Sequence, residues 1–371
     1  MTALPILSSP APRRRLAAGL AVALGLAVSP LVFGPPSSAR AETKPVPATP
    51  LRSAAPPKRT AAPRTPVPPT TGKPPAPVTH AVPAAKPQQK PDIAFGAYQR
   101  GYFLTAFHEA TKRVEEANDP RAMTLLGELY ANGLGIPQDD EKAAEWYRLA
   151  AGRGDRDAMF ALAMFRLGGR AGAKDPSEAA KLLAAAAKLG HASAAYDLGL
   201  FYMEGQIFPQ DIGRAAELFR QSAAGGSPEA QYALAILYKE GRGVQQDLGE
   251  AAKLLGQAAL AGIVDAQVEY GIALFNGTGT AKNEAEAAAW FRRAAMRGSP
   301  IAQNRLARLL SVGRGVAADP VQAIKWHLVA SAGGAADPYM DEFAGKQTPE
   351  VRAAAEKAAK GWLDVIRQSR S

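Results

Sequence analysis

The sequence predicts an all-α protein, an α-solenoid of about six 36-residue helix-turn-helix repeats with capping helices at both ends. Three observations indicate this fold. Small residues recur every 36 residues, a glycine follows the first helix of each repeat (helix A), and Asp or Asn precedes the second (helix B). Two of the columns are Ala122, Ala158, Ala194, Ala230, Ala266 and Ala302, and Gly133, Gly169, Gly205, Gly241, Gly277 and Gly313.

Residues 1–41 have the order of a secretory signal peptide. Arg13–Arg15 precede the uncharged run LAAGLAVALGLAVS, Pro30 ends it, and Ala39 and Ala41 form an A-x-A cleavage pattern. The run is shorter than the roughly 20 residues that a membrane span needs. We therefore expect export and cleavage after Ala41. An uncleaved segment that anchors the chain in the inner membrane is the alternative.

Residues 42–91 are predicted to be a Pro-rich disordered tether, because 15 prolines remove backbone donors and fix φ. The net charge of +10 divides into +4 for residues 1–41 (four Arg, no acid), +7 for 42–91 (eight Lys or Arg, one Glu) and −1 for 92–371. The basic signal therefore does not indicate a nucleic-acid groove in the folded part. The tether is interpreted as a spacer, or as a contact for anionic envelope polymers and lipid headgroups.

Residues 92–121 are predicted to be an N-terminal capping helix pair. Asn118 lies 36 residues before Gly154, and Asn also tolerates the left-handed conformation that ends a helix. Residues 338–371 are predicted to hold a C-terminal capping helix that begins at Thr348, with Pro at its first position. One apolar stripe on that helix would close the array: Val351, Ala355, Ala358, Trp362 and Val365.

The six repeats span 122–337, and each is interpreted as two antiparallel helices. In the fourth, Ala230 and Leu234 lie on one face of helix A, and Gly241 ends it. The predicted N-caps of the B helices are Asp139, Asp175, Asp211, Asp247, Asn283 and Asp319. The Gly-x-Gly at 241–243 is therefore a helix stop. A dinucleotide-binding loop needs a preceding strand and a third glycine three residues on.

The stretches LYKEGRGVQQDLGEAAKLLGQAALAG and LYANGLGIPQDDEKAAEWYRLAAGRG resemble the Sel-like repeat family, αα-hairpin solenoids related to tetratricopeptide repeats. The resemblance implies an adaptor for protein partners, and many bacterial members are exported. Some regulate membrane sensor kinases or scaffold envelope complexes. A subfamily that binds penicillin-like ligands has a disulfide in each repeat, so a chain without Cys matches it poorly. Arg166 replaces the usual tyrosine and Ile207 the second loop glycine, so these loops are expected to differ locally.

The sequence indicates no catalytic residue, metal ligand or cofactor site. Without Cys there is no disulfide and no thiolate nucleophile. The four histidines are not at metal-ligand spacing, and no H-E-x-x-H or G-x-S-x-G motif is present. His327 occupies the column of Tyr147 and Phe219, so we expect it to be packed. We predict a protein that is not an enzyme and binds no cofactor.

Helix A carries a second apolar stripe, at positions two, six and nine residues after the column alanine, about 180° from the core-facing side. In tetratricopeptide-like hairpins these positions line the concave groove. An open stripe would bind an amphipathic helix or an extended peptide; the alternative is a tight superhelix that covers it. The stripe is polar in the first and last repeats, where it contains Thr124, Glu128, Asn304, Arg308 and Ser311. The candidate groove residues are Phe160, Met164, Leu167, Tyr196, Leu200, Met203, Tyr232, Ile236, Val268, Ile272 and Phe275.

These features together predict a non-catalytic protein-interaction scaffold or regulator in the envelope of a Gram-negative bacterium. The expected partner is an envelope protein, such as a membrane sensor or an assembly complex, and not nucleic acid. The expected location is the periplasm, with inner-membrane anchoring or secretion as alternatives. A cell-wall or exopolysaccharide binding module is the alternative function. A hydrolase ranks below both, because carboxylates are plentiful but no catalytic pair stands out.

Overall fold

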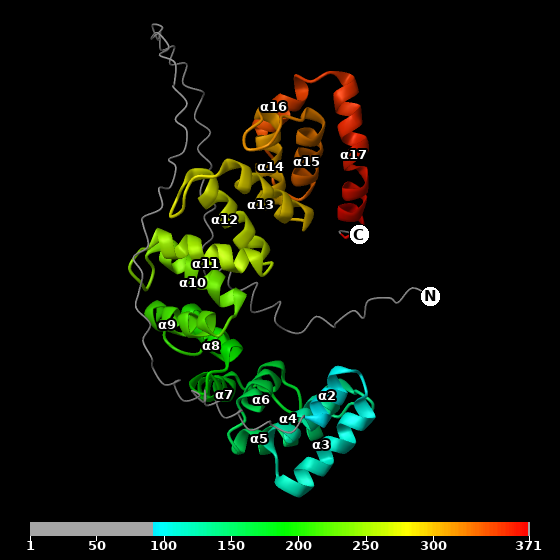
Figure 1. Ribbon diagram of the computed structural model, residues 1–371, viewed down its shortest axis with the longest axis vertical. Coiled ribbons are helices and arrows are strands. Elements are labelled where there is room, and N and C mark those ends of the chain that lie inside the picture. The colour runs from blue at the N-terminus through cyan, green and yellow to red at the C-terminus, as the bar shows by residue number, and fades with distance from the viewer. Residues whose placement is uncertain (1–91, 370–371) are drawn as a thin grey trace, which may run out of the picture. The chain divides into compact units, whose positions relative to one another are not determined.

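The computed structural model describes residues 92–369, so the predicted signal peptide and tether lie outside the described residues. Residues 92–369 form sixteen helices and no strand, which confirms the all-α prediction. Twelve of these helices form six hairpins that follow one another along the chain (Figure 1). The A helices are α4 (Pro120–Asn132), α6 (Arg156–Gly168), α8 (Ala192–Glu204), α10 (Pro228–Glu240), α12 (Val264–Asn276) and α14 (Pro300–Val312). The B helices are α5 (Asp140–Gly152), α7 (Pro176–Lys188), α9 (Ile212–Ala224), α11 (Leu248–Leu260), α13 (Glu284–Met296) and α15 (Pro320–Ala332).

The repeat helices begin and end through the same local chemistry. In α11 the Asp247 side chain accepts a hydrogen bond from the backbone N–H of Glu250 at 2.9 Å. Gly241 ends α10 in the left-handed conformation, with φ of 68°. The N-caps predicted from the sequence are confirmed in all six B helices: Asp139, Asp175, Asp211, Asp247, Asn283 and Asp319.

Capping helices close both ends of the array. At the N-terminal end α2 (Ile93–Gln99) and α3 (Phe103–Ala117) form a helix pair, and Asn118 ends α3 with φ of 49°. At the C-terminal end α16 (Pro338–Gly345) precedes α17 (Pro349–Gln368). The predicted start of the last helix is confirmed, because the Thr348 side chain accepts a hydrogen bond from the N–H of Val351.

The predicted apolar stripe of α17 is partly wrong. Ala355 and Ala359 are fully buried, whereas Ala358 and Val365 are exposed. Trp362 packs its ring 5.4 Å from that of Trp326 in α15. The buried face therefore follows residues 355, 359 and 362, since α17 lies against α15 at a slightly different rotation than a stripe through 358 and 365 requires.

Each internal A helix packs between two B helices, one from its own repeat and one from the preceding repeat. For example, α10 contacts α11 and also α9, as the stacked hairpins in Figure 1 show. Small residues allow this close packing, because the alanines at the contact points of the B helices are almost fully buried. Large rings fill the remaining space; those of Tyr147, Phe219 and Phe291 are completely buried. The core therefore crosses repeat boundaries; one cluster, for example, joins buried residues of α6, α7, α8 and α9.

Candidate partner-binding site

The predicted groove residues are mostly buried. Phe160, Met164 and Leu167 in α6 are half-buried. The other eight expose at most 7% of their surface: Tyr196, Leu200, Met203, Tyr232, Ile236, Val268, Ile272 and Phe275. Repeats three to five therefore have the packed arrangement and not an open apolar surface. Partner binding by these residues stays a prediction, and only the three in α6 are accessible without rearrangement.

Packing against two B helices explains the burial of the stripe. In a single isolated hairpin, the side of helix A that faces away from helix B would be exposed to solvent. In the array each internal helix A has a B helix on two sides, so most side chains of α8, α10 and α12 are buried. The stripe is also not turned fully away from its own helix B, since the Tyr196 ring in α8 lies 5.5 Å from that of Phe219 in α9.

An open pocket lies instead at the N-terminal end of the array. Its volume is about 440 Å³, and it is formed where the capping pair meets α4 and the start of α6. Both apolar and charged side chains line it. The lining residues are Asp92, Ala94, Phe95, Tyr98, Arg113, Arg121, Ala122, Thr124, Leu125, Glu128, Asp155 and Asp157. We call this the N-terminal pocket.

Helix caps position two of the carboxylates in the N-terminal pocket. Asp92 caps α2 by accepting from the N–H of Phe95 at 3.0 Å, and it pairs with Arg113. Burial alone would raise the pKa of Asp92, but these two hydrogen bonds hold it below its ordinary value. Asp155 caps α6 by accepting from the N–H of Ala158 at 2.7 Å, and it also accepts from the Thr124 hydroxyl at 3.0 Å. Both carboxylates are therefore fixed by the start of a helix.

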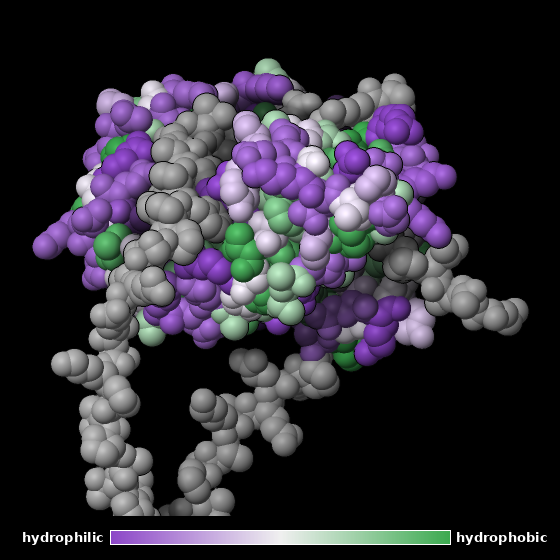
Figure 2. Space-filling model, turned by 90° about the horizontal axis from the view of Figure 1, so that it is seen from above, coloured by the Kyte–Doolittle hydropathy of each residue, from purple (hydrophilic) through white to green (hydrophobic). Residues whose placement is uncertain are grey.

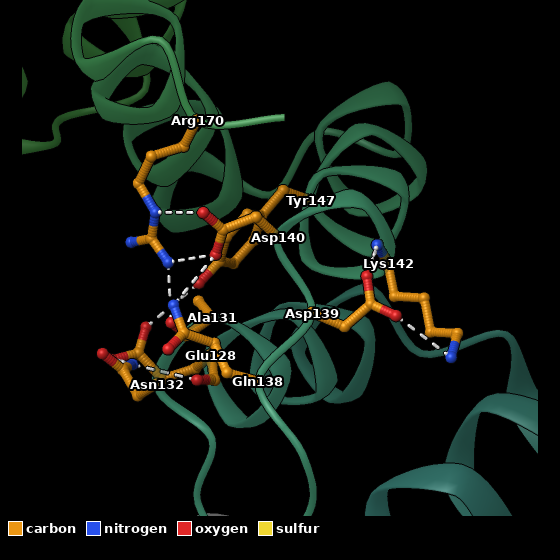
Figure 3. A network of polar contacts seen from close by, with 9 residues as sticks. All are labelled: Glu128, Ala131, Asn132, Gln138, Asp139, Asp140, Lys142, Tyr147 and Arg170. Carbon is orange, nitrogen blue, oxygen red and sulfur yellow. Dashed lines mark hydrogen bonds and ion pairs between the residues drawn. The ribbon is translucent and has the colours of Figure 1, made fainter. Parts of the chain in front are cut away.

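Glu128 is held in the same pocket by neutral donors. Its carboxylate accepts from the hydroxyls of Tyr98 at 3.5 Å and Tyr147 at 3.3 Å, and from the Asn132 amide at 3.2 Å. Burial, and next the negative charge of Glu128, raise the pKa of Tyr147, so its hydroxyl stays a donor. Figure 3 shows that Arg170, close to this group, is directed instead to Asp140 and to the backbone oxygen of Ala131.

Comparison with known proteins places the array in a family. A model of the Sel1 repeat matches six consecutive segments: residues 120–155, 156–191, 192–227, 228–263, 264–299 and 300–334. The chain belongs to the Sel1 repeat family. The matched segments correspond to the six hairpins from α4 to α15, so the family assignment and the observed period agree. No curated protein matches the chain.

Two solved structures share this fold. A protective antigen present in uropathogenic Escherichia coli strains, which displays an SLR fold, is 26% identical with a TM-score of 0.51, over 73% of this chain and 67% of the other. A Sel1 repeat protein from Oxalobacter formigenes is 25% identical with a TM-score of 0.53, over 65% of this chain and 97% of the other. Sel1 repeat proteins are generally non-catalytic scaffolds for protein interactions.

The histidines of this Sel1 repeat protein that fall in the array have structural roles. His191 caps α8, because its Nδ1 accepts from the N–H of Ala194 at 3.0 Å, and its ring stacks on Phe160. His327 is buried, as expected, with Nε2 2.8 Å from Asp341. No group of three or more His, Cys, Asp or Glu side chains in residues 92–369 is placed to hold a metal ion. No helix in that range is long and apolar enough to cross a membrane.

Sequence reasoning missed the N-terminal pocket. Thr124 and Glu128 are recognisable from the sequence as polar exceptions in the apolar stripe, and this was the available signal. The other wall comes from Phe95 and Tyr98 in α2, and its position depends on how the capping pair folds back on α4. The repeat period does not extend to these residues, so it could not predict that contact.

Proposed function

We propose that this Sel1 repeat protein is a non-catalytic scaffold or regulator in the envelope of a Gram-negative bacterium. It binds a peptide segment of a protein partner at the N-terminal pocket and along the adjoining face of α6. The family supports the general role, because Sel1 repeats are generally interaction scaffolds. The partner is an envelope protein, such as a membrane sensor or a component of an assembly complex.

The observation that carries the proposal is the concentration of exposed apolar side chains in the capping pair, which forms one wall of the pocket. Ile93, Phe95, Tyr102 and Leu104 lie within twelve residues, and each exposes between 49% and 68% of its surface. Elsewhere, on the face seen in Figure 2, hydrophilic side chains predominate and hydrophobic ones are scattered. Single exposed apolar residues are normal, but a group of them in one short segment that also lines a pocket is typical of a partner site.

The accessible part of the predicted groove extends this surface along one helix. Asp157 lines the pocket near the start of α6, and Phe160 and Met164 follow at spacings of three and four residues. These spacings place the three side chains on one face of the helix. Phe160 and Met164 are half-buried, so a bound segment could contact them without unfolding the repeat.

The envelope location rests on residues 1–41, whose signal-peptide pattern lies outside the described residues. The Pro-rich segment 42–91 would then separate the array from the site of export and, with its +7 charge, could contact anionic envelope polymers. Inner-membrane anchoring through an uncleaved signal is the alternative arrangement. Both arrangements place the pocket outside the cytoplasm.

Site-specific photocross-linking in the native bacterium tests the proposal. The full chain would carry a benzoyl-phenylalanine in place of Phe95, in the pocket, or in place of Leu260, which is 76% exposed at the end of α11. Cells would be irradiated and fractionated. We expect a discrete protein adduct with the first variant, in the envelope fraction, and none with the second.

Three results would count against the proposal. Equal adducts from both positions would mean that capture is not specific to the pocket. A glycan adduct without protein would favour the polysaccharide-binding alternative. An adduct found only in the cytoplasmic fraction would contradict the envelope location.

A further inference from the structure

The N-terminal pocket has an excess of negative charge at its lining. Four carboxylates line it, from Asp92, Glu128, Asp155 and Asp157, against two guanidinium groups. One of these two, Arg113, is already shared between Asp92 and Asp119, and Asp157 pairs with Arg156 outside the lining. Within residues 92–369, Glu128 and Asp155 form no ion pair with a Lys or Arg side chain. The pocket therefore has unused acceptor capacity for a cation.

The donors to Glu128 orient its carboxylate without cancelling its charge. Hydroxyl and amide groups are neutral, so the hydrogen bonds from Tyr98, Tyr147 and Asn132 fix the two oxygens and leave the negative charge in place. A carboxylate fixed in advance loses less side-chain entropy when a cation binds. Glu128 is thus preorganised to accept a charge-assisted hydrogen bond.

Aromatic rings form the wall next to this carboxylate. Phe95 and Tyr98 stack with their centroids 6.2 Å apart, and Phe95 is half exposed. An aromatic face attracts a cation, and it also packs against the methylene chain of a long basic residue. Leu125 and Ala94 add apolar surface. An apolar wall beside an oriented carboxylate matches a side chain with an apolar stem and a positive head.

We propose that the N-terminal pocket binds a Lys or Arg side chain of the partner, next to an apolar residue of the same segment. The inference deepens the proposed function and rests on it. The volume of about 440 Å³ lies within the roughly 300–1,000 Å³ of known ligand pockets, which is room for such a side chain and its neighbour. Charge complementarity selects a basic segment over an acidic one.

Selection from a random 12-residue phage-display library on the full chain tests this inference. The matched proteins are the wild type, Glu128→Gln in the pocket and Glu217→Gln in α9, which removes an exposed carboxylate paired with Arg214. Gln keeps one oxygen that can accept from one tyrosine hydroxyl, and its amide N–H can donate to the oxygen of the other. Circular dichroism would check that each variant folds. A selected peptide and its Lys→Gln or Arg→Gln counterpart would then be titrated by fluorescence polarisation.

We expect selected peptides with Lys or Arg beside an apolar residue. The basic peptide should bind Glu128→Gln about tenfold more weakly than the wild type or Glu217→Gln, the size of one charge-assisted hydrogen bond. The neutral counterpart should bind the wild type and Glu128→Gln equally.

Selected peptides without a basic residue, or equal binding of the basic peptide to all three proteins, would overturn the inference and leave the scaffold function standing. A library that yields no binder at all would overturn both. A concentration-dependent dimer of the wild type that Glu128→Gln abolishes would assign the pocket to a second copy and not to a partner.

Discussion

At the scale of single residues, the second glycine of the loop between helices A and B allows the backbones of neighbouring repeats to approach closely. Gly243, Gly279 and Gly315 all have φ between 66° and 71°. A Cβ at Gly279 would overlap the backbone oxygen of Leu248, in the first turn of the preceding helix B. These positions therefore require glycine for two reasons: the backbone is in the left-handed conformation, and the neighbouring backbone leaves no room for a Cβ.

The second and third repeats show what happens without this glycine. Ala171 keeps a left-handed φ of 53°, whereas Ile207 is not among the residues with positive φ. In the third loop Phe208, after Ile207, stacks on Tyr202 with the ring centroids 4.8 Å apart. The expectation that these loops differ locally is confirmed, and the 36-residue period continues past them.

Gly279→Ala should destabilise the protein more than Gly298→Ala. Both glycines have positive φ, so each change costs about 1–2 kcal/mol of backbone strain. A Cβ at Gly298 meets nothing within 4 Å, whereas at Gly279 it overlaps backbone and adds about 1–3 kcal/mol of overpacking. Urea unfolding followed by circular dichroism would give both free energies. Equal losses of unfolding free energy in the two variants would show that the close backbone approach at Gly279 does not exclude a Cβ.

At the scale of helices and loops, two arginines connect a loop to the preceding repeat. Arg170, after α6, donates from Nε to Asp140 at 2.9 Å, in the first turn of α5. Arg314, after α14, makes the same link to Glu284 in α13. In both cases the arginine lies 30 residues after its acid, so the period places the same contact at two points of the array.

The Glu284 link should make stability depend on pH. Hydrogen bonds from Arg314, and next from Lys282, lower the pKa of Glu284 to about 2, from an ordinary value of 4.5. Because the folded pKa is depressed, the stabilisation is complete above about pH 4.5 and is lost as the pH falls toward 2. Glu284→Gln should remove about 1 kcal/mol of this dependence, since the partly exposed pair is screened by solvent.

Urea unfolding at pH 6 and pH 3 would measure the effect. The wild type should lose more free energy of unfolding between the two values than Glu284→Gln loses. Glu217→Gln, in an exposed pair within one helix, is the control and should behave as the wild type. If Glu284→Gln lost as much free energy of unfolding between pH 6 and pH 3 as the wild type, Glu284 would contribute nothing to the pH dependence.

The local parts of this structure were predictable from the sequence, and the parts that depend on a neighbouring repeat were not. Asp247 and Thr348 were recognised as caps because an N-cap bonds within three residues. The burial of Ile236 was left open, since it depends on packing between α9 and α11. The position of Phe95 relative to Glu128 depends on the capping pair, which has no repeat pattern to guide its placement.

At the scale of the whole array, the uniform period predicts that one repeat can be removed. Every repeat helix has 13 residues, and the family model matches without gaps from 120 to 334. In such arrays each repeat contacts only its neighbours, so stability is approximately a sum of repeat and interface contributions. Removing one complete repeat should therefore leave the others in register.

Deletion of residues 228–263 joins Ser227 directly to α12. In the native chain Ser227 caps α10 through its side chain, whereas Ile263 makes no side-chain cap for α12, so the junction gains a cap. The close contact of the loop is also preserved. In the native chain Gly243 approaches Ile212 and Gly279 approaches Leu248, so in the shortened chain Gly279 can approach Ile212 in the same way. The shortened protein should fold, with unchanged helical ellipticity per residue, a single unfolding transition and a lower midpoint because one interface is lost.

Deletion of residues 228–245 is the matched control. It removes α10 but keeps α11, so two B helices become neighbours and the face that α9 presents to an A helix loses its partner. This protein should lose helical ellipticity or aggregate, although its deletion is half as long. If both shortened proteins unfolded alike, the repeats would not be interchangeable, and specific side chains of α10 would carry the stability instead of the period. If both folded alike, stacking in the array would not depend on the alternation of A and B helices.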